Sequence, residues 1–414
     1  MPGFSREPLT IRLQENETAP GIDLPAELAS ALRSRYKPEQ LKIAPSWAGG
    51  YDLSAGNHIG TIAYSGPAGG LRIIIEPKVP IANLFYMLTY AHELPDFGRE
   101  VAPLVAGEDL FDLVVRIFIG QVDDIVRRGI HRGYVDFEEH APHLRGRLLL
   151  AQQVRRGTVA VAFHQRTNEF TADLLENRIL RGMLSLLARV PFADRELSLR
   201  IRRTLSAFAE ASPVSVGPAD CGRVVYTRLN ERYRSPINLA RLFLKHLSLE
   251  GRSGETPFVT FLVPMYQLFE LFVARLLERE LAALPRYSVH PQETIWLDEA
   301  RQLKARPDMV LNRDGRPLLV LDTKYKVYNE KPAEADIYQM VTYCHTLHVE
   351  RAILIYPSDH APDDRYRMRS GVWLESRTVS LTGSLATFQE RCREFAAELT
   401  ATIERYEAPE ASTL

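Results

Sequence analysis

Cysteine is scarce in this chain of 414 residues, and long apolar runs are missing. Its three cysteines, Cys221, Cys344 and Cys392, are odd in number and widely spaced, which excludes a zinc-binding spacing and a disulfide framework. No run of about 18 apolar residues occurs, so we expect no membrane-spanning helix. The first residues contain no apolar segment of the kind found in secretory signals. These absences predict a cytoplasmic protein.

A nucleotide-binding loop is also missing. No G-x-x-x-x-G-K-[ST] sequence occurs, and the Gly-rich stretch GPAGG at 66–70 lacks the lysine that such a loop needs. This stretch instead predicts a hairpin turn between two strands. We therefore expect no nucleoside triphosphate to bind this chain through such a loop.

Net charge is nearly absent, at −1, but the charges are unevenly distributed. Residues 101–260 contain 23 basic and 18 acidic residues, and Lys245 is the only lysine among the basic ones. Arginines such as Arg145, Arg147 and Arg155 suit contacts with DNA phosphates. They equally suit surface ion pairs with nearby acidic residues such as Glu138, and the sequence leaves both interpretations open.

Length and pattern predict a multidomain α/β protein. We expect an N-terminal α+β domain at 1–100, a mostly helical, arginine-rich region at 101–256 and a C-terminal α/β domain at 257–414, with a linker at 251–257. The predicted strands are 9–15, 58–66, 70–79, 133–139, 158–164, 287–297, 303–312, 316–324, 351–356 and 372–380. The predicted helices are 24–36, 81–94, 109–128, 171–189, 195–211, 236–249, 264–284, 333–347 and 384–406.

The pattern with most chemical content is the predicted hairpin at 304–326, KARPDMVLNRDGRPLLVLDTKYK. Asp308 lies on its first strand, and Asp322 and Lys324 lie two residues apart on its second. Because side chains alternate along a strand, Asp322 and Lys324 are expected on one face. Hairpin pairing can bring Asp308 beside Asp322. An Asp–Lys ion pair at a hairpin end would explain the same residues without catalysis.

Two close carboxylates repel one another, and a divalent cation relieves that repulsion. Oxygen ligands suit Mg²⁺, which can polarise a phosphoryl oxygen and activate a bound water. Lys324 would add positive charge for the attacking water and the developing phosphorane charge. The sequence thus predicts a site able to hydrolyse phosphodiesters.

The flanking helices carry three further candidates. Glu270 precedes the hairpin and is a candidate metal ligand or, alternatively, a solvated surface glutamate. Gln339 and Tyr343 follow the hairpin and share one helical face, from which they could brace Lys324 or a phosphate. Ordinary helix-surface positions are the other interpretation for this pair.

The sequences ARPDMVL, VLDTKYKVY and DIYQMVTYCH resemble the McrC family, the nuclease subunits of McrBC-type 5-methylcytosine-specific restriction systems. Pro307-Asp308 with Asp322-Thr323-Lys324 resembles the core motif of the PD-(D/E)xK superfamily. IIIEPKVPIANLFYMLTYAHELPDF at 73–97 is similar to the leading domain of the family. The resemblance covers both ends of the chain, and the middle matches mainly by helical pattern.

The resemblance implies a C-terminal PD-(D/E)xK nuclease domain with a mixed sheet flanked by helices. It implies a Mg²⁺-dependent DNA endonuclease with catalytic Asp308, Asp322, Lys324, Glu270 and Gln339, of which Asp308, Asp322 and Glu270 hold the metal. It also implies an McrB-like AAA+ GTPase partner that binds the GTP, recognises modified cytosine in double-stranded DNA and docks on the N-terminal domain.

Two alternatives remain at this stage. The chain could be a non-cleaving scaffold that mainly activates the partner GTPase. It could also be an unrelated α/β adaptor with a chance Asp-x-Lys sequence, which predicts carboxylates of Asp308 and Asp322 too far apart to share a cation.

Overall fold

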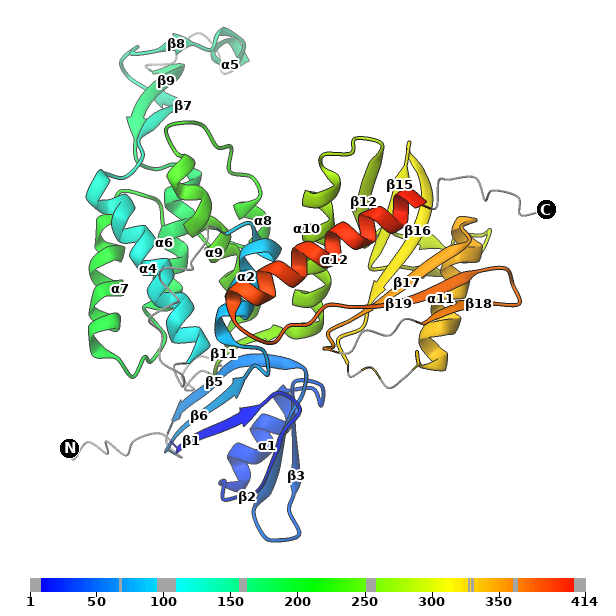
Figure 1. The fold of residues 1–414 in the computed structure, drawn as a ribbon. Helices are drawn as coiled ribbons and strands as arrows, with labels where there is room; N and C mark the ends of the chain where they lie inside the picture. The colour runs from blue at the N-terminus through cyan, green and yellow to red at the C-terminus, as the bar shows by residue number, and fades with distance from the viewer. Residues whose placement is uncertain are drawn as a thin grey trace. The chain divides into compact units, whose positions relative to one another are not determined.

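The chain forms two compact units in the computed structural model (Figure 1). Unit 1 combines Met1–Asp109 with Arg252–Leu414, and unit 2 is Leu110–Gly251. The structure describes residues 9–66, 69–94, 109–155, 162–250, 258–326, 328, 331–359 and 364–405. The predicted boundary at residue 100 and the predicted linker at 251–257 lie outside the described residues. The predicted N-terminal domain (1–100) and the predicted C-terminal domain (257–414) therefore belong to the same compact unit. Their division into two separate domains stays a prediction.

The N-terminal part of unit 1 is built on a sheet in which four strands of this unit follow the order β1-β6-β5-β11. β1 pairs with β6 in parallel, and the other neighbouring pairs are antiparallel. A Cβ atom at Gly60 would lie 2.0 Å from the carbonyl oxygen of Phe261, so this close approach of strands requires glycine. The strands are β1 (Leu9–Gln14), β5 (His58–Gly66), β6 (Gly69–Glu76) and β11 (Phe258–Pro264).

Strands β1, β5 and β6 were predicted, and the antiparallel pairing of Gly66 with Gly69 agrees with the predicted hairpin, whose residues 67–68 lie outside the described residues. Strand β11 was not predicted. A second, three-stranded sheet of order β2-β4-β3 was also missed, and it shares an apolar core with the predicted helix α1. These elements are β2 (Thr18–Ile22), α1 (Ala26–Arg35), β3 (Leu41–Pro45) and β4 (Tyr51–Ala55).

Three helices of unit 1 pack against one another through aromatic side chains. Tyr86, Phe272 and Phe388 come from different helices, and their ring centroids lie 5.6–6.2 Å apart. The side-chain amide of Asn83 donates to the carbonyl oxygen of Leu381 at 3.0 Å, which joins two segments almost 300 residues apart. The helices are α2 (Ile81–His92), α10 (Met265–Leu281) and α12 (Leu385–Arg405), all three predicted.

The C-terminal part of unit 1 contains a six-stranded mixed sheet of order β12-β15-β16-β17-β19-β18, as the sequence predicted for an α/β domain. β16, β17 and β19 run in parallel, whereas β12, β15 and β18 pair with their neighbours antiparallel. The predicted segment 287–297 divides into β12 and β13, and 303–312 divides into β14 and β15, whereas β18 was not predicted. The elements are β12 (Tyr287–Pro291), β13 (Ile295–Trp296), β14 (Lys304–Ala305), β15 (Met309–Arg313), β16 (Arg316–Thr323), α11 (Glu334–Leu347), β17 (Arg351–Tyr356), β18 (Arg365–Arg367) and β19 (Trp373–Thr378).

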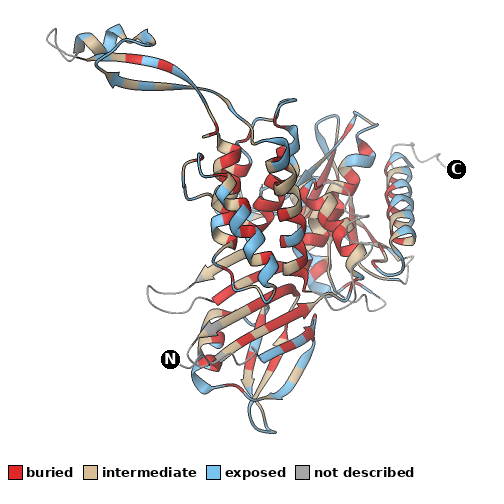
Figure 2. Cartoon of the chain, turned by 90° about the vertical axis from the view of Figure 1, so that its left-hand side faces the viewer, coloured by how far each residue is buried: buried red, intermediate tan, exposed pale blue. Residues whose placement is uncertain are grey.

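Unit 2 is a helical body with a protruding arm, which consists of strands β7, β8 and β9 with helix α5 (Figure 1). The helices turn buried faces toward each other, whereas the arm surface is mostly exposed or intermediate (Figure 2). The predicted helices are confirmed. The predicted strand at 158–164 lies partly outside the described residues, and its described counterpart β9 begins later. The elements are α4 (Leu110–Arg128), β7 (Gly133–Ala141), β8 (Arg147–Leu148), α5 (Leu150–Arg155), β9 (Phe163–Thr171), α6 (Leu175–Leu187), α7 (Arg195–Ala207), α8 (Pro218–Cys221), a 3₁₀ turn (Glu231–Tyr233), α9 (Arg234–His246) and β10 (Leu247–Glu250).

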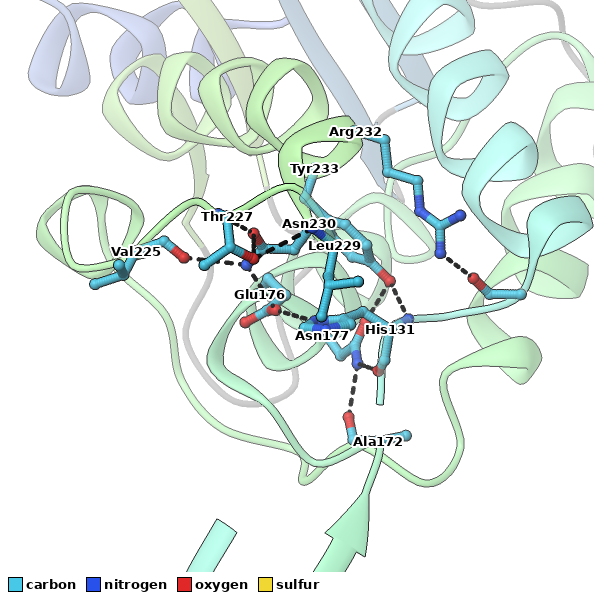
Figure 3. A network of polar contacts seen from close by, with 11 residues as sticks. His131, Ala172, Glu176, Asn177, Val225, Thr227, Leu229, Asn230, Arg232 and Tyr233 are labelled. Carbon is cyan, nitrogen blue, oxygen red and sulfur yellow. Dashed lines mark hydrogen bonds and ion pairs between the residues drawn. The ribbon is translucent and has the colours of Figure 1, made fainter. Parts of the chain in front are cut away.

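A buried polar network lies where the arm joins the helices of unit 2 (Figure 3). Asn177 donates to the carbonyl oxygens of His131 and Ala172, which precede β7 and follow β9. The Tyr233 hydroxyl donates to Asn177 Oδ1 at 2.9 Å and accepts from the His131 amide at 2.7 Å. Glu176 completes the network through the His131 ring at 2.7 Å. Both ends of the arm are therefore fixed to one set of buried partners.

None of the described helices is long and apolar enough to cross a membrane.

Candidate functional site

Asp308 and Asp322 lie side by side at the end of the β15–β16 pair. The last aligned residues of that pair are Met309 and Leu321, so Asp308 and Asp322 face each other one step further. Directly opposed residues of antiparallel strands have Cα atoms about 4.5–5.5 Å apart. The charge of Asp308 raises the pKa of Asp322, so the two carboxylates interact, which disagrees with the wide separation that the adaptor hypothesis predicts. Asp308 Oδ2 accepts hydrogen bonds from the amide and hydroxyl of Thr323, both at 2.7 Å.

Lys324 is surrounded by three side chains that fix its ammonium group. Asp322 is buried, with 1% of its surface exposed, and its Oδ2 lies 2.6 Å from Lys324 Nζ. The alternation along the strand therefore places these two residues on one face, as predicted. Lys324 Nζ also donates to Gln339 Oε1 at 2.9 Å and lies 3.7 Å from Asp336 Oδ1. The Gln339 amide donates in turn to the Tyr343 hydroxyl at 2.7 Å, which confirms that both helical residues face the site.

Glu270 belongs to the same site and is held there by Gln292. The Gln292 amide group donates to Glu270 Oε1 at 2.8 Å, and its backbone N–H donates to the carbonyl oxygen of Asp308 at 2.9 Å. Gln292 has a φ of 51°, a left-handed conformation that is uncommon outside glycine. One strained residue thus links the Glu270 carboxylate to the backbone of Asp308, and such strain is frequent at functional sites.

Electrostatics confirm that the three carboxylates influence one another. Burial and the nearby charge of Asp308 raise the pKa of Glu270 to about 7. Burial and the same charge raise the pKa of Asp322 to about 6, and burial raises the pKa of Asp308. Burial opposes the charged form of Lys324, but the carboxylates of Asp322, Asp336 and Asp308 outweigh it and raise its pKa. The lysine therefore stays cationic while the carboxylates resist simultaneous ionisation.

The oxygen atoms of the site fit a hard divalent cation. Asp322 Oδ2 is buried, and among the described residues it has the Lys324 ion pair but no hydrogen bond of good geometry. Asp308 and Glu270 each use one oxygen for a hydrogen bond to the described residues, which leaves the second oxygen for a ligand. Across the described part of the chain, however, no group of three or more His, Cys, Asp or Glu side chains is arranged so that it could hold a metal ion. Carboxylate oxygens are the ligands that Mg²⁺ prefers, so the chemistry of the donors fits this ion although their present arrangement does not close around one.

The sequence did not identify three residues that complete this arrangement. Thr323 orients Asp308, Gln292 orients Glu270, and the buried Asp336 lies between Lys324 and Lys326, accepting a hydrogen bond from the latter. Thr323 could have been identified from the sequence, because it stands between Asp322 and Lys324 on a strand predicted to pair with the strand of Asp308. Asp336 could not have been identified, because an acidic residue in the first turn of a helix is common. Gln292 could not have been identified either, because it lies between two strands in a segment without a periodic pattern.

Several arginines of the middle region form surface ion pairs. Arg127 and Arg128 pair with Asp124 at 3.2 and 3.0 Å, and Arg145 pairs with Glu139 at 3.2 Å. The ion-pair interpretation is thus confirmed for these side chains. Arg156 and the side chain of Arg155 lie outside the described residues, and contact with DNA stays a prediction.

The described fold and site define a multidomain α/β protein with a carboxylate–lysine cluster at the end of a β-hairpin. Residues 53–357 match the family described as "McrBC 5-methylcytosine restriction system component", and the chain belongs to that family. It is 24% identical over 322 residues to the type IV methyl-directed restriction enzyme EcoKMcrBC of Escherichia coli strain K12, covering 71% of this chain and 90% of the relative.

A solved structure shows the same fold. The chain resembles a chain in the refined half-complex from the tetradecameric assembly of Thermococcus gammatolerans McrB AAA+ hexamers with bound McrC. The TM-score is 0.61 and the identity 20%, with 94% of this chain and 100% of that chain covered. The likeness extends over nearly the whole chain, so both units belong to the shared architecture.

Proposed function

We propose that this protein is the DNA-cleaving subunit of a modification-dependent restriction complex and hydrolyses DNA phosphodiesters with Mg²⁺. The observation that carries the proposal is the cluster of Asp308, Asp322 and Glu270 beside a fixed Lys324. Its arrangement on a hairpin between α10 and α11 supports assignment to the PD-(D/E)xK superfamily. Membership of the McrBC family supplies the biological setting.

Each residue of the cluster has a role that follows from its contacts. Asp308, Asp322 and Glu270 would hold the cation through oxygens that the described side chains leave available. When bound, the cation supplies Lewis-acid polarisation of a phosphoryl oxygen and a more acidic water. Lys324 keeps its positive charge and presents it where charge develops on the phosphate. Gln339 and Asp322 prevent the long lysine side chain from rotating away.

The partner is proposed from the relatives. The similar chain of Thermococcus gammatolerans belongs to an assembly of McrB AAA+ hexamers with bound McrC, and the Escherichia coli relative is a methyl-directed restriction enzyme. By analogy, the present chain would bind an McrB-like AAA+ GTPase through its N-terminal part and act on double-stranded DNA with modified cytosine. GTP would then bind the partner and not this chain.

The decisive experiment replaces Lys324 with methionine, which keeps side-chain length and removes the charge. Wild-type protein, with its AAA+ partner, GTP and Mg²⁺, should cut methylated plasmid. Lys324→Met should cut about 10²–10³-fold more slowly, because one preorganised charge is lost. Lys304→Met, a change of an exposed lysine in the same part of unit 1, is the matched control and should cut normally.

The partner's GTPase activity separates catalysis from assembly. Lys324→Met should stimulate GTP hydrolysis as well as the wild type does. Cutting by Lys324→Met at the wild-type rate would refute the assignment of the site. A wild-type chain that stimulates GTP hydrolysis but never cuts would establish the non-cleaving scaffold instead.

A further inference from the structure

Asp336 is a buried carboxylate that has no role yet in the proposed cleavage. It lies in the first turn of α11 with 7% of its surface exposed. Its Oδ2 accepts a hydrogen bond from Lys326 Nζ, and its Oδ1 lies 3.7 Å from Lys324 Nζ. A buried charge is costly unless it is paired, so this carboxylate depends on the two lysines. The contact with Lys326 is a hydrogen-bonded ion pair, whereas the contact with Lys324 is longer than a hydrogen bond.

The ammonium group of Lys324 lies between one strand and one helix. Asp322 of β16 approaches it to 2.6 Å, and Gln339 of α11 accepts a hydrogen bond from it at 2.9 Å. Asp336 and Gln339 are three residues apart on α11, so they share one helical face. Charge-assisted N–H···O bonds are about 2.7–2.9 Å long, so the ammonium needs to approach Asp336 by only about 1 Å to bond to it.

The ion pair between Lys324 and Asp322 opposes the binding of a cation. Asp322 is one of the three carboxylates that are proposed to hold Mg²⁺, and its Oδ2 faces the ammonium. If Asp322 bound Mg²⁺ in this arrangement, the ammonium would lie close to a divalent cation. Like charges repel strongly in a buried site, where the effective dielectric constant is low. The lysine is therefore expected to move away from Asp322 when that carboxylate binds the cation.

We propose that Asp336 is the second ion-pair partner of Lys324 and accepts its ammonium group when Asp322 binds the cation. The inference rests on the proposed nuclease function. Gln339 can stay bonded to the ammonium during this shift, because it presents its acceptor from the same helical face as Asp336. Lys326 holds Oδ2 of Asp336, so Oδ1 remains directed at Lys324. Asp336 is thus a positioning residue, which acts on cation binding through Lys324.

The electrostatics of Lys324 agree with this role. Burial lowers the pKa of Lys324, but the carboxylates of Asp322, Asp336 and Asp308 outweigh burial, so the pKa is raised. Asp336 therefore already stabilises the charged lysine. When the charge of Asp322 is offset by a cation, Asp336 is the neighbouring carboxylate outside the proposed metal ligands that keeps the ammonium charged.

Binding of Mg²⁺ to the full chain without DNA tests this coupling. Urea denaturation at pH 8 and constant ionic strength is repeated at increasing MgCl₂ concentration, and the gain in unfolding free energy gives the Kd. Asp336→Asn keeps the shape of the side chain and removes its charge. It should weaken Mg²⁺ binding about tenfold, because Lys324 then stays on Asp322. Glu334→Gln removes an exposed charge from the same helical turn and, as the matched control, should keep the wild-type Kd.

A double-mutant cycle separates the proposed route from direct attraction between Asp336 and the cation. In the Lys324→Met background no ammonium competes for Asp322, so Mg²⁺ should bind more tightly than to the wild type. Asp336→Asn should then change the Kd by less than about twofold. Direct attraction would instead preserve the tenfold loss in this background. Asp336→Ser, which is also uncharged, should give the same pattern and replaces Asp336→Asn if that variant does not unfold cooperatively.

Three outcomes would overturn the inference. These are an unchanged Kd in Asp336→Asn, an equal loss of affinity in both backgrounds, and no stabilisation of the wild type by millimolar Mg²⁺. The cleavage assay keeps this result separate from the proposed function. A chain that cuts DNA but shows no coupling between Asp336 and Lys324 retains the nuclease assignment and loses the second ion-pair partner. A chain that shows the coupling without cutting retains the partner and loses the nuclease.

Discussion

Replacing Glu270 with glutamine should stabilise unit 1 at alkaline pH while abolishing cleavage. Burial and the charge of Asp308 raise the pKa of Glu270 to about 7 from an ordinary 4.5. The folded protein therefore holds a proton between pH 4.5 and 7 that the unfolded chain has released. By linkage, stability falls as the pH rises through this window, and the whole cost is present above pH 7. The rise in the pKa of Glu270 corresponds to a loss of at most about 3 kcal/mol in the free energy of unfolding above pH 7.

Urea denaturation followed by tryptophan fluorescence measures the free energy of unfolding of unit 1 alone. The three tryptophans, Trp47, Trp296 and Trp373, all lie in unit 1. Glu270→Gln should match the wild type near pH 4.5 and exceed it by up to about 3 kcal/mol at pH 8, without Mg²⁺. Glu280→Gln, at an exposed position on the same helix, is the control and should follow the wild type at both pH values.

Adding Mg²⁺ completes the test. A cation that binds the folded carboxylates stabilises the wild type at pH 8, and the gain should shrink in Glu270→Gln. Equal stability of wild type and variant at every pH would refute the electrostatic reasoning. A stabilised variant that still cuts DNA would show that Glu270 is buried for some purpose other than catalysis.

Three further variants test separate features. Gln292→Gly keeps the left-handed backbone but removes the side-chain hydrogen bond that lowers the pKa of Glu270. The acidic limb of the pH–rate profile should therefore move to higher pH. An unmoved profile would exclude a role of Gln292 in positioning Glu270. Trp47→Ala removes a fully exposed side chain and should change stability by less than about 0.5 kcal/mol. Because Trp47 lies in the N-terminal part proposed to bind the partner, GTPase stimulation should fall, and full stimulation would show that Trp47 does not contact the partner. Tyr233→Phe leaves Asn177 and the His131 amide unsatisfied and should destabilise unit 2 by about 1–3 kcal/mol in denaturation followed by circular dichroism. Unchanged stability would show that water replaces the hydroxyl.

The sequence predicted those features of the site that depend on the regular spacing of side chains along one strand, hairpin or helix. Alternation along β16 placed Asp322 and Lys324 on one face, and hairpin pairing placed Asp308 beside Asp322. The helical spacing of Gln339 and Tyr343 also predicted a shared face, and the structure adds the hydrogen bond between them. Each of these inferences needed only the geometry of a single element or one short hairpin.

The unpredicted parts depend on contacts between distant segments. Strand β11 is seven residues long and pairs with β5, which ends about 190 residues earlier, so no local turn signal identifies the pairing. Gln292 acquires its role through an unusual backbone conformation in an irregular segment. Glu15 faces Tyr325 across 310 positions of sequence. Such relations arise from tertiary packing and have no counterpart in periodicity.

The discontinuity of unit 1 determines the order in which the protein can fold on the ribosome. β5 and β6 emerge early, but β11, which pairs with β5, follows only after all of unit 2 has been translated. At about 5–20 residues per second, the edge of β5 waits roughly ten to forty seconds for its partner. Unit 2 is continuous in sequence and can fold during that interval. The nascent N-terminal sheet meanwhile exposes an unpaired edge, at which another chain can pair with it.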